Sequence, residues 1–369
     1  MDFEIIKGKD NAVFSGCDFV VRLPKDRENT KIKILQLTDT QVIDSRQRRY
    51  PDRIRADEIS AWRPEKFDIM CGNHIRSLVA QTKPDLIILT GDIIYGSFDD
   101  KGTTFEWFCK LMDSLKTPWA PVFGNHDNES ERGVSWQCER FAESEYCLFE
   151  RGTVTGNGNY TVGIAVGDTL VRVLHMIDSN GCKASEDAAV TKTPGIYGDQ
   201  LELIRANTEK IELAQKRKVP AFMAFHIPVS CFREAERAKG YQTEEREFYT
   251  IGVDVDGIGE DFGFNLEKYT PIEVGDEFID FVHSQNINGV FVGHIHKCTT
   301  AIDYKDVKWV FGFKTGQYDY HVPGQIGGTL ITLLGGEFSV LRIPALVHFG
   351  PMPRKAKIFN DFFADESEA

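Results

Sequence analysis

Several features that define other protein classes are missing from this chain of 369 residues. No apolar run reaches about 18 residues, the length that a membrane-spanning helix needs. The opening stretch, MDFEIIKGKD, lacks the basic start and apolar core of a secretory signal peptide. The net charge is −13, and no segment is rich in Lys and Arg. Both features argue against nucleic acid or a membrane as a partner. We therefore expect a cytoplasmic protein.

Closely spaced cysteines are also missing. The eight cysteines are scattered along the chain and form no CxxC pair. Zinc ribbons and the disulfide frameworks of small secreted domains both need such spacing, so reduced thiols are expected. The sequence contains no GxSxG nucleophile elbow, no P-loop and no dinucleotide fingerprint, which removes three common enzyme classes.

What the chain does contain is apolar, β-rich runs in alternation with helical patterns. Five runs are typical of strands buried on both faces, at residues 32–38, 85–90, 119–124, 220–225 and 288–293. Helical patterns cover residues 64–82, 103–115 and 197–216. This alternation is typical of α/β layers.

Other segments have the pattern of antiparallel strands joined by glycine-containing turns. They lie at residues 159–167, 169–178, 299–304, 308–313, 329–334 and 338–343. We predict one layered α/β domain over residues 1–355, with two central sheets and helices outside. Residues 233–267 are charged and glycine-rich and are expected to form a loop or cap, and residues 356–369 form an acidic tail.

Each of the five buried-type strands leads into a polar side chain that can bind a metal ion. These residues are Asp39, Asp92, Asn125 with His126, His226, and His294 with His296. Ligands of open α/β sheets gather beyond the carboxyl ends of the strands, so these side chains should meet at one edge. Carboxylate, amide and imidazole groups without thiolate suit manganese, iron or zinc. The set is too large for one ion, and two metals can act together in phosphoryl hydrolysis.

The ordered motifs DTQ, GDIIY, GNHD, FHIP and GHIH resemble the calcineurin-like metallophosphoesterase superfamily, whose pattern is DxH, GDxx, GNH[DE], a lone His and GHxH. The resemblance implies a four-layer αββα sandwich with two mixed β-sheets, flanking helices and a binuclear metal centre. It implies a phosphohydrolase that uses a metal-bound hydroxide as its nucleophile. The implied ligands are Asp39, Asp92 and His296 for the first metal, and Asp92, Asn125, His226 and His294 for the second.

The same resemblance implies that His126 contacts the phosphate and assists the leaving group, with Asp127 orienting it. Gln41 departs from the pattern, because the usual histidine of DxH is a ligand of the first metal. GDxxY, however, is similar to the purple acid phosphatase branch, closest to its small intracellular members, in which a tyrosine takes over as ligand. This implies Tyr95 as a ligand and iron paired with iron, manganese or zinc as the cofactor.

Alternatives stay open at this point. A phosphomonoester, carried by a phosphorylated small molecule or a phosphoprotein, is favoured as substrate over a phosphodiester such as a cyclic nucleotide. Gln41 keeps open a third function, a catalytically weakened binding or scaffold protein. The remaining histidines are interpreted as His175 in the core, His321 in a loop, and His74, His283 and His348 without a role. Residues 254–261 resemble a calcium loop but lack its closing Glu, so an acidic cap is expected there.

Overall fold

The computed structural model describes residues 3–8, 11–43, 67–99, 101–183, 185–239, 249–251, 261–317, 319–322 and 325–345. Three features singled out in the sequence lie outside these ranges: the acidic tail, His348 and nearly all of the calcium-loop-like segment 254–261. The extent of the predicted domain, residues 1–355, stays a prediction.

One central sheet has five strands in the order β15-β14-β3-β4-β5. Its parallel part consists of β3 (Ile32–Leu37), β4 (Leu86–Thr90) and β5 (Trp119–Val122). The hairpin of β14 (Gly327–Leu334) and β15 (Glu337–Pro344) joins it by antiparallel pairing of β14 with β3. The C-terminal strands therefore complete a sheet that the N-terminal half begins.

The other sheet has eight strands in the order β1-β2-β6-β7-β8-β11-β13-β12. The bounds are β1 (Glu4–Lys7), β2 (Phe19–Leu23), β6 (Tyr160–Val166), β7 (Thr169–Met176), β8 (Ala221–Ala224), β11 (Ile287–Val292), β12 (Ala301–Tyr304) and β13 (Val307–Phe311). Strands β7, β8, β11 and β13 run parallel to one another, whereas the β1–β2, β6–β7 and β12–β13 pairs are antiparallel. Both sheets are therefore mixed, as predicted.

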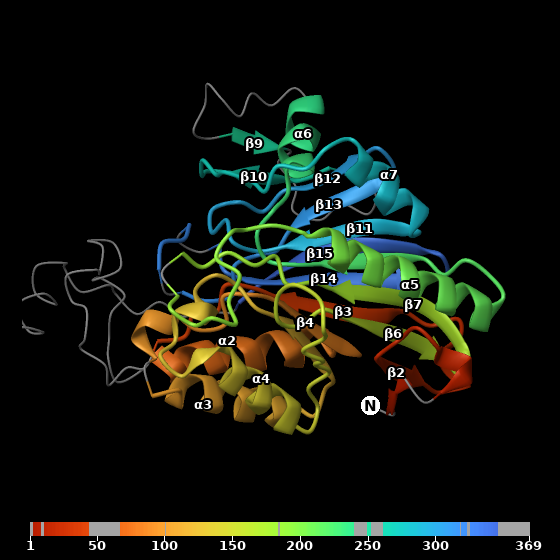
Figure 1. Cartoon of the computed structure of the whole chain (residues 1–369), viewed down its shortest axis with the longest axis horizontal. Helices are drawn as coiled ribbons and strands as arrows, with labels where there is room; N and C mark the ends of the chain where they lie inside the picture. Colours follow the sequence, from red (N-terminus) through yellow and green to blue (C-terminus); the bar gives the residue numbers. More distant parts are fainter. Residues whose placement is uncertain are drawn as a thin grey trace, which may run out of the picture.

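Helices cover the outer faces of the two sheets (Figure 1). On the side of the five-stranded sheet lie α2 (Phe67–Thr82), α3 (Thr103–Ser114) and α4 (Gly133–Glu143). On the side of the eight-stranded sheet lie α5 (Gly198–Gln215), α6 (Ser230–Ala238) and α7 (Glu277–Ser284). The layers are helix, sheet, sheet, helix, which confirms the predicted αββα sandwich.

Alternate residues of the central strands face different layers. In β8, Phe222 and Ala224 belong to the core that includes the space between the sheets, whereas Ala221 and Met223 pack towards α5, α6 and α7. All four side chains are buried, which explains why this strand reads as a continuous apolar run rather than an alternating one. None of the helices in the described ranges has both the length and the apolar character needed to cross a bilayer.

The segment 233–267, expected to be a loop or cap, contains more regular structure in its described parts. It begins within α6 and includes the short antiparallel pair of β9 (Tyr249–Ile251) and β10 (Gly263–Asn265). Isolated bridges from Phe262 to Ala301 and from Asn265 to Cys298 connect this pair to the main body. Its role as a cap stays a prediction.

Candidate metal centre

The carboxyl ends of five parallel strands from both sheets meet at one edge of the sandwich, as the sequence predicts. Strands β3, β4 and β5 lead to Asp39, Asp92 and Asn125 from one sheet, and β8 and β11 lead to His226 and His294 from the other. The chain turns sharply there, since Asp39, Asp92 and His294 have φ angles of 48°, 50° and 74°. Non-glycine residues rarely adopt this left-handed conformation, and it is typical of functional sites.

Two glycines allow the turns to approach one another. A Cβ atom on Gly124 would lie 2.2 Å from Oδ1 of Asp92, and one on Gly91 would lie 2.6 Å from Nδ1 of His226. Neither distance is possible for a real side chain, and Gly91 also has a φ of 86°. The glycines of the GD and GN motifs are therefore required for the close packing of the acidic and histidine side chains.

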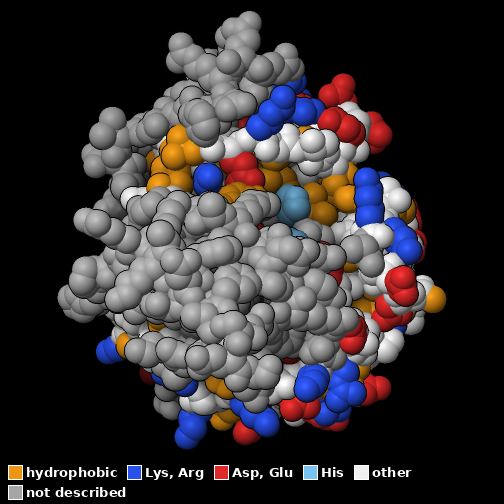
Figure 2. All heavy atoms as spheres, turned by 90° about the vertical axis from the view of Figure 1, so that its left-hand side faces the viewer, with side chains coloured by type: hydrophobic (Ala, Val, Ile, Leu, Met, Phe, Trp, Pro, Cys, Tyr) orange, Lys and Arg blue, Asp and Glu red, His pale blue; other side chains and the backbone are white. Residues whose placement is uncertain are grey.

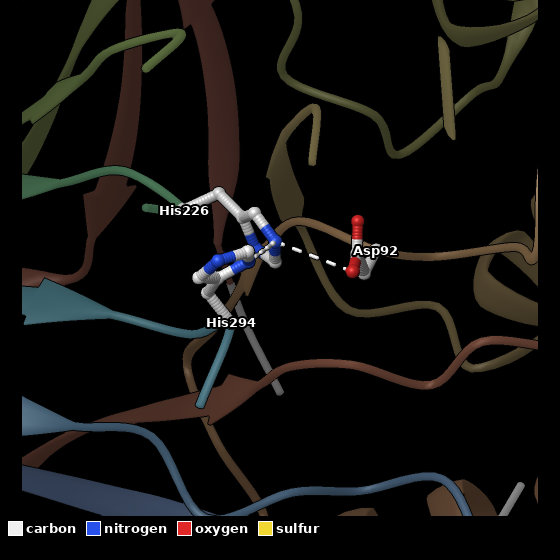
Figure 3. Close-up of side chains that lie close together, drawn as sticks. All are labelled: Asp92, His226 and His294. Atoms are coloured by element: carbon white, nitrogen blue, oxygen red, sulfur yellow. Dashed lines mark hydrogen bonds and ion pairs between the residues drawn. The ribbon is translucent and has the colours of Figure 1, made fainter. Parts of the chain in front are cut away.

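One ligand group consists of Asp92, His226 and His294, which were predicted for the second metal (Figure 3). Nε2 of His226 lies 3.3 Å from Oδ2 of Asp92 and 3.2 Å from Nδ1 of His294. Asp92 and His226 are almost fully buried. One ligand atom from each of the three residues lies within 4.8 Å of the other two, which is close enough for all three to contact one cation.

The other ligand group consists of Asp39, Asp92 and His296, which were predicted for the first metal, and all three are buried. Nε2 of His296 lies 3.3 Å from Oδ1 of Asp39, and the ligand atoms of the group again lie within 4.8 Å of one another. Asp92 belongs to both groups. Two adjacent groups that share one carboxylate form the arrangement that a binuclear metal centre needs.

The histidine tautomers fit metal ligation. Nδ1 of His226 lies 2.7 Å from the carbonyl oxygen of Thr90, and Nδ1 of His296 lies 3.1 Å from that of Tyr320. A carbonyl oxygen can only accept a hydrogen bond, so Nδ1 must carry the proton in both rings. Each ring therefore presents Nε2 to the carboxylates, and loss of the Nε2 proton would leave a lone pair there for a metal ion, as in metal-binding histidines that donate their other nitrogen to a backbone carbonyl.

Asn125 gives separate evidence that these residues suit a bound metal ion. Its Oδ1 atom is buried and has no hydrogen-bond partner among the described residues. A buried polar atom without a partner is costly, and such atoms are rare in folded proteins. A cation beside Asn125 would satisfy this oxygen, and carboxylate, amide and imidazole donors together suit a first-row metal.

The electrostatics of the site favour ionised carboxylates. Burial opposes the ionisation of Asp92, but the neighbouring imidazoles of His226 and His126 outweigh it and hold its pKa well below the usual range. For Asp39, burial is likewise outweighed by the hydrogen bond and the charge of His296, so its pKa is also lowered. Negative charge is therefore concentrated where the two ligand groups meet.

His126 lies beside the ligand groups and has a carboxylate partner that the sequence analysis missed. Its Nδ1 lies 2.9 Å from Oε2 of Glu129, and its backbone N–H donates to Oδ1 of Asp92 at 2.9 Å. Burial lowers the pKa of His126, but the charges of Asp92 and Glu129 outweigh it and raise the pKa to about 9. The i, i+3 spacing in a short turn was the only sequence signal for Glu129.

Asp127 does not orient His126, which corrects the role expected from the sequence. Its Oδ1 accepts hydrogen bonds from the N–H groups of Ile93 and Ile94 at 2.9 and 3.0 Å, and its Oδ2 accepts one from Gly124 at 2.7 Å. Both oxygens are therefore committed to backbone donors. Asp127 ties the turn after β4 to the turn after β5, and so holds Asp92 and Asn125 next to each other.

Tyr95, an expected ligand, lies at the edge of the same site. Its ring stacks on the ring of His126, with 4.3 Å between centroids and 28° between planes. This contact restrains His126 from the side, while Glu129 restrains it through Nδ1. Ligation of a metal by Tyr95 stays a prediction.

The other histidines lie away from the two ligand groups or contact them only indirectly. His175 is buried in β7, with Nδ1 3.1 Å from the hydroxyl of Thr161, which confirms its predicted place in the core. His321 is half-buried and contacts the carbonyl of Asp319. His283 contacts the carbonyl of Lys305, and His74 is buried in α2.

A cavity of 610 Å³ opens beside the ligand groups. Its lining includes Asn125, His294 and Glu129 together with charged, polar and apolar residues: Gly181, Cys182, Lys183, Lys192, Pro194, Ile227, Thr270, Pro271, Ile272 and Glu273. Figure 2 shows the face of the molecule on which histidine atoms are visible between hydrophobic and acidic side chains. A molecule bound in the cavity could contact both the ligand residues Asn125 and His294 and the apolar residues of the lining.

Comparisons with known proteins find a matching family model and several similar proteins. The family model described as Calcineurin-like phosphoesterase matches residues 32–298. Two similar curated proteins come from Arabidopsis thaliana. Probable inactive purple acid phosphatase 14 is 21% identical over 85% of this chain and 77% of that protein. Probable inactive purple acid phosphatase 28 is 25% identical over 70% of this chain and 64% of that protein. A similar solved structure is a dimetal phosphatase from Danio rerio, with 12% identity, a TM-score of 0.42, and coverage of 84% of this chain and 98% of that one.

Proposed function

The chain belongs to the calcineurin-like phosphoesterase family, and on that premise we propose that it hydrolyses phosphomonoesters at a centre of two metal ions. The observation that carries the proposal is the pair of ligand groups that share Asp92. Asp39 and His296 complete one group, and His226 and His294 complete the other. A site for a single structural cation would not need two ligand groups that share one carboxylate.

The proposal assigns Asp39, Asp92, His296 and Tyr95 to the first metal, and Asp92, Asn125, His226 and His294 to the second. The unpaired oxygen of Asn125 supports its place in the second set. Iron paired with iron, manganese or zinc suits these oxygen and nitrogen donors. When bound, two such cations neutralise the charge of a phosphate ester and activate water.

Residues outside the ligand sets position the substrate and move a proton. In the metal-free protein the pKa of His126 is raised to about 9, and Glu129, which is outside the ligand sets, lies beside its Nδ1, so His126 can donate a proton to the departing oxygen of the ester. Glu129 and Tyr95 hold the imidazole in place from two directions. The cavity beside Asn125 and His294 gives the leaving group room.

We favour a monoester over a diester because the GDxxY pattern of Tyr95 resembles the purple acid phosphatase branch. The cavity does not decide between the two esters, because its lining contains two glutamates, Glu129 and Glu273, beside Lys183 and Lys192. Ile227, Pro271 and Ile272 provide an apolar wall for the rest of the substrate. A phosphorylated small molecule or the phosphorylated residue of a protein fits this description.

We also propose a cytoplasmic location. All eight cysteines are thiols rather than halves of disulfides, and a large chain that keeps its cysteines reduced is typical of a reducing compartment. Imaging a tagged full-length chain in cells tests this point, and a signal confined to the secretory pathway would contradict it.

A second candidate function is binding without turnover. The observation that favours it is the description of similar proteins from Arabidopsis thaliana as inactive, together with Gln41 in place of the histidine of the DxH pattern. Against it, the two ligand groups, the cavity and the His126–Glu129 pair all occur together in this chain.

The experiment that separates these functions compares hydrolysis of nitrophenyl phosphate and bis-nitrophenyl phosphate by protein reloaded with manganese, iron or zinc. Faster turnover of the monoester supports the proposal, and faster turnover of the diester replaces it with a phosphodiesterase. Protein that holds two metals but hydrolyses neither ester would favour the binding function.

A further inference from the structure

Glu267 joins two chain segments that lie on either side of the metal-ligand residue His296. Its Oε2 accepts a hydrogen bond at 3.2 Å from the backbone N–H of Lys297, the residue directly after His296. Its Oε1 accepts a hydrogen bond from the hydroxyl of Tyr320. Both oxygens of one carboxylate are therefore bound to neighbours of His296, Lys297 being a neighbour in sequence and Tyr320 a neighbour in space.

Tyr320 and the residue before it determine how the ring of His296 is turned. The carbonyl oxygen of Tyr320 lies 3.1 Å from Nδ1 of His296, and the two rings pack together with 4.3 Å between centroids and 30° between planes. Oδ2 of Asp319 lies 3.5 Å from the same Nδ1. With Nδ1 engaged in this way, Nε2 of His296 faces Oδ1 of Asp39 at 3.3 Å. The orientation of the ligand therefore depends on where residues 319–320 lie.

Backbone pairing brings Glu267 to this place. Strand β10 ends at Asn265, which forms an antiparallel bridge with Cys298. The flanking N–H groups donate across the pair at 2.8 Å, Leu266 to Lys297 and Thr299 to Phe264. In an antiparallel pair, a step forward on one strand matches a step back on the other. Two further residues in this register therefore place Glu267 opposite His296.

We propose that Glu267 is a positioning residue for the first metal, which holds His296 in its ligating orientation through Tyr320 and Lys297. This inference rests on the proposed binuclear centre. Groups that orient a metal ligand are part of the site, and their loss typically weakens metal binding about 10- to 100-fold. Only one of the two metals should be affected, because His296 belongs to the group with Asp39 and not to the group that His226 and His294 complete.

A second carboxylate of the same segment provides a contrast. Oδ1 of Asp261 accepts a hydrogen bond from the backbone N–H of Asp303 at 2.7 Å, and Oδ2 lies 2.5 Å from Nζ of Lys239. Asp261 therefore also fastens this part of the chain to the main body. Neither of its partners is a metal-ligand residue or adjacent to one in sequence, whereas Glu267 binds residues that contact or follow His296.

The test measures zinc affinity without relying on activity. Metal-free full-length protein is dialysed against a series of free Zn²⁺ concentrations set by a chelator, and bound zinc per chain is counted by elemental mass spectrometry. Wild-type protein is expected to bind two ions. Glu267→Ala should shift one binding step to about 10- to 100-fold higher free zinc and leave the other step unchanged. Asp261→Ala is the matched control and should keep both steps at their wild-type positions.

A conservative variant separates the two hydrogen bonds of Glu267 from its bulk effect on the fold. In Glu267→Gln, the amide oxygen can accept from the N–H of Lys297, and the NH₂ group can donate to the hydroxyl oxygen of Tyr320. This variant is therefore expected to recover most of the zinc affinity that Glu267→Ala loses. Affinity as low as that of Glu267→Ala would contradict the proposed hydrogen-bonding role.

A double variant tests whether Glu267 acts through His296. His296→Ala should weaken the same binding step, and adding Glu267→Ala should then cause no further loss of zinc. A further loss in the double variant would overturn the inference, because it would show that Glu267 supports the site by another route.

The zinc titration also distinguishes failure of this inference from failure of the proposed function. Wild-type affinity of Glu267→Ala for both ions, or equal weakening of both steps, would overturn the inference and leave the phosphohydrolase proposal intact. If Glu267→Ala fails to fold, Tyr320→Phe decides, because it removes only the hydroxyl that Glu267 binds. Selective weakening of one step in Tyr320→Phe supports the inference, and unchanged affinity overturns it. If wild-type protein binds no zinc, the inference fails together with the proposed function.

Discussion

Nε2 of His226 lies 3.3 Å from Oδ2 of Asp92 although the two residues belong to different sheets. Asp92 follows β4 of the five-stranded sheet, and His226 follows β8 of the eight-stranded sheet. The ligand groups therefore lie across the junction between the sheets, and any cation bound there connects the two halves of the sandwich.

Metal binding is expected to stabilise the fold for this reason. A ligand that binds only the folded state at about 100 times its dissociation constant adds about 2.7 kcal/mol to the free energy of unfolding. Thermal unfolding of metal-free protein, with and without added manganese or zinc, measures the effect. Equal melting temperatures under both conditions would show that the ligand groups do not hold an ion.

His126 is expected to act in chemistry and not in metal binding. His126→Gln removes the proton donor and should lower kcat about 10²- to 10⁴-fold, while the metal content per chain stays at the wild-type value. Glu129→Gln removes the group that orients His126 and should lower kcat by a smaller factor. Glu139→Gln, an exposed change on α4, is the control, and a similar loss in all three variants would contradict the assignment.

Asp127 is expected to act in stability. Asp127→Asn replaces a carboxylate that accepts three backbone hydrogen bonds with an amide whose NH₂ group must face a backbone N–H. The loss should be about 2 to 4 kcal/mol in the free energy of unfolding, measured by chemical denaturation. Asp168→Asn, which breaks only an exposed ion pair with Arg22, should cost less than about 1 kcal/mol; equal losses would contradict the role of Asp127.

His175 should make the metal-free protein less stable in acid. Burial lowers its pKa from 6.5 to about 4, so below pH 6.5 the unfolded chain takes up a proton that the folded chain does not. Stability from this group is complete above pH 6.5 and is lost as the pH falls towards 4. Between pH 7 and pH 5, His175→Leu should lose about 2 kcal/mol less than wild type in denaturation experiments, and identical losses would refute the assignment.

The layers and the ligand residues could be predicted from the sequence because both follow from local patterns. Continuous apolar runs such as β4 and β11 indicate strands buried on both faces, and a polar residue directly after each run indicates the edge where ligands gather. Thus Asp92 and His294 were predicted to meet although they are about 200 residues apart, and the structure brings them together.

Which strands share a sheet could not be predicted, because pairing depends on packing between distant segments. The β14–β15 hairpin joins β3, whereas β12 and β13 join β11, although all four strands have similar patterns. Glu267 was missed for the same physical reason. Its partner Tyr320 lies 53 residues away, and nothing in its immediate sequence indicates a contact near the metal-ligand residues.

The most direct test of the account is the metal content per chain of wild-type protein and Asp92→Asn, measured beside the rate of nitrophenyl phosphate hydrolysis on the same samples, with Asp168→Asn as control. If Asp92 is shared by both ligand groups, wild type and the control hold two ions and are active, whereas Asp92→Asn loses both ions and the activity. An Asp92→Asn protein that holds two ions and hydrolyses the ester at the wild-type rate would contradict the proposed centre.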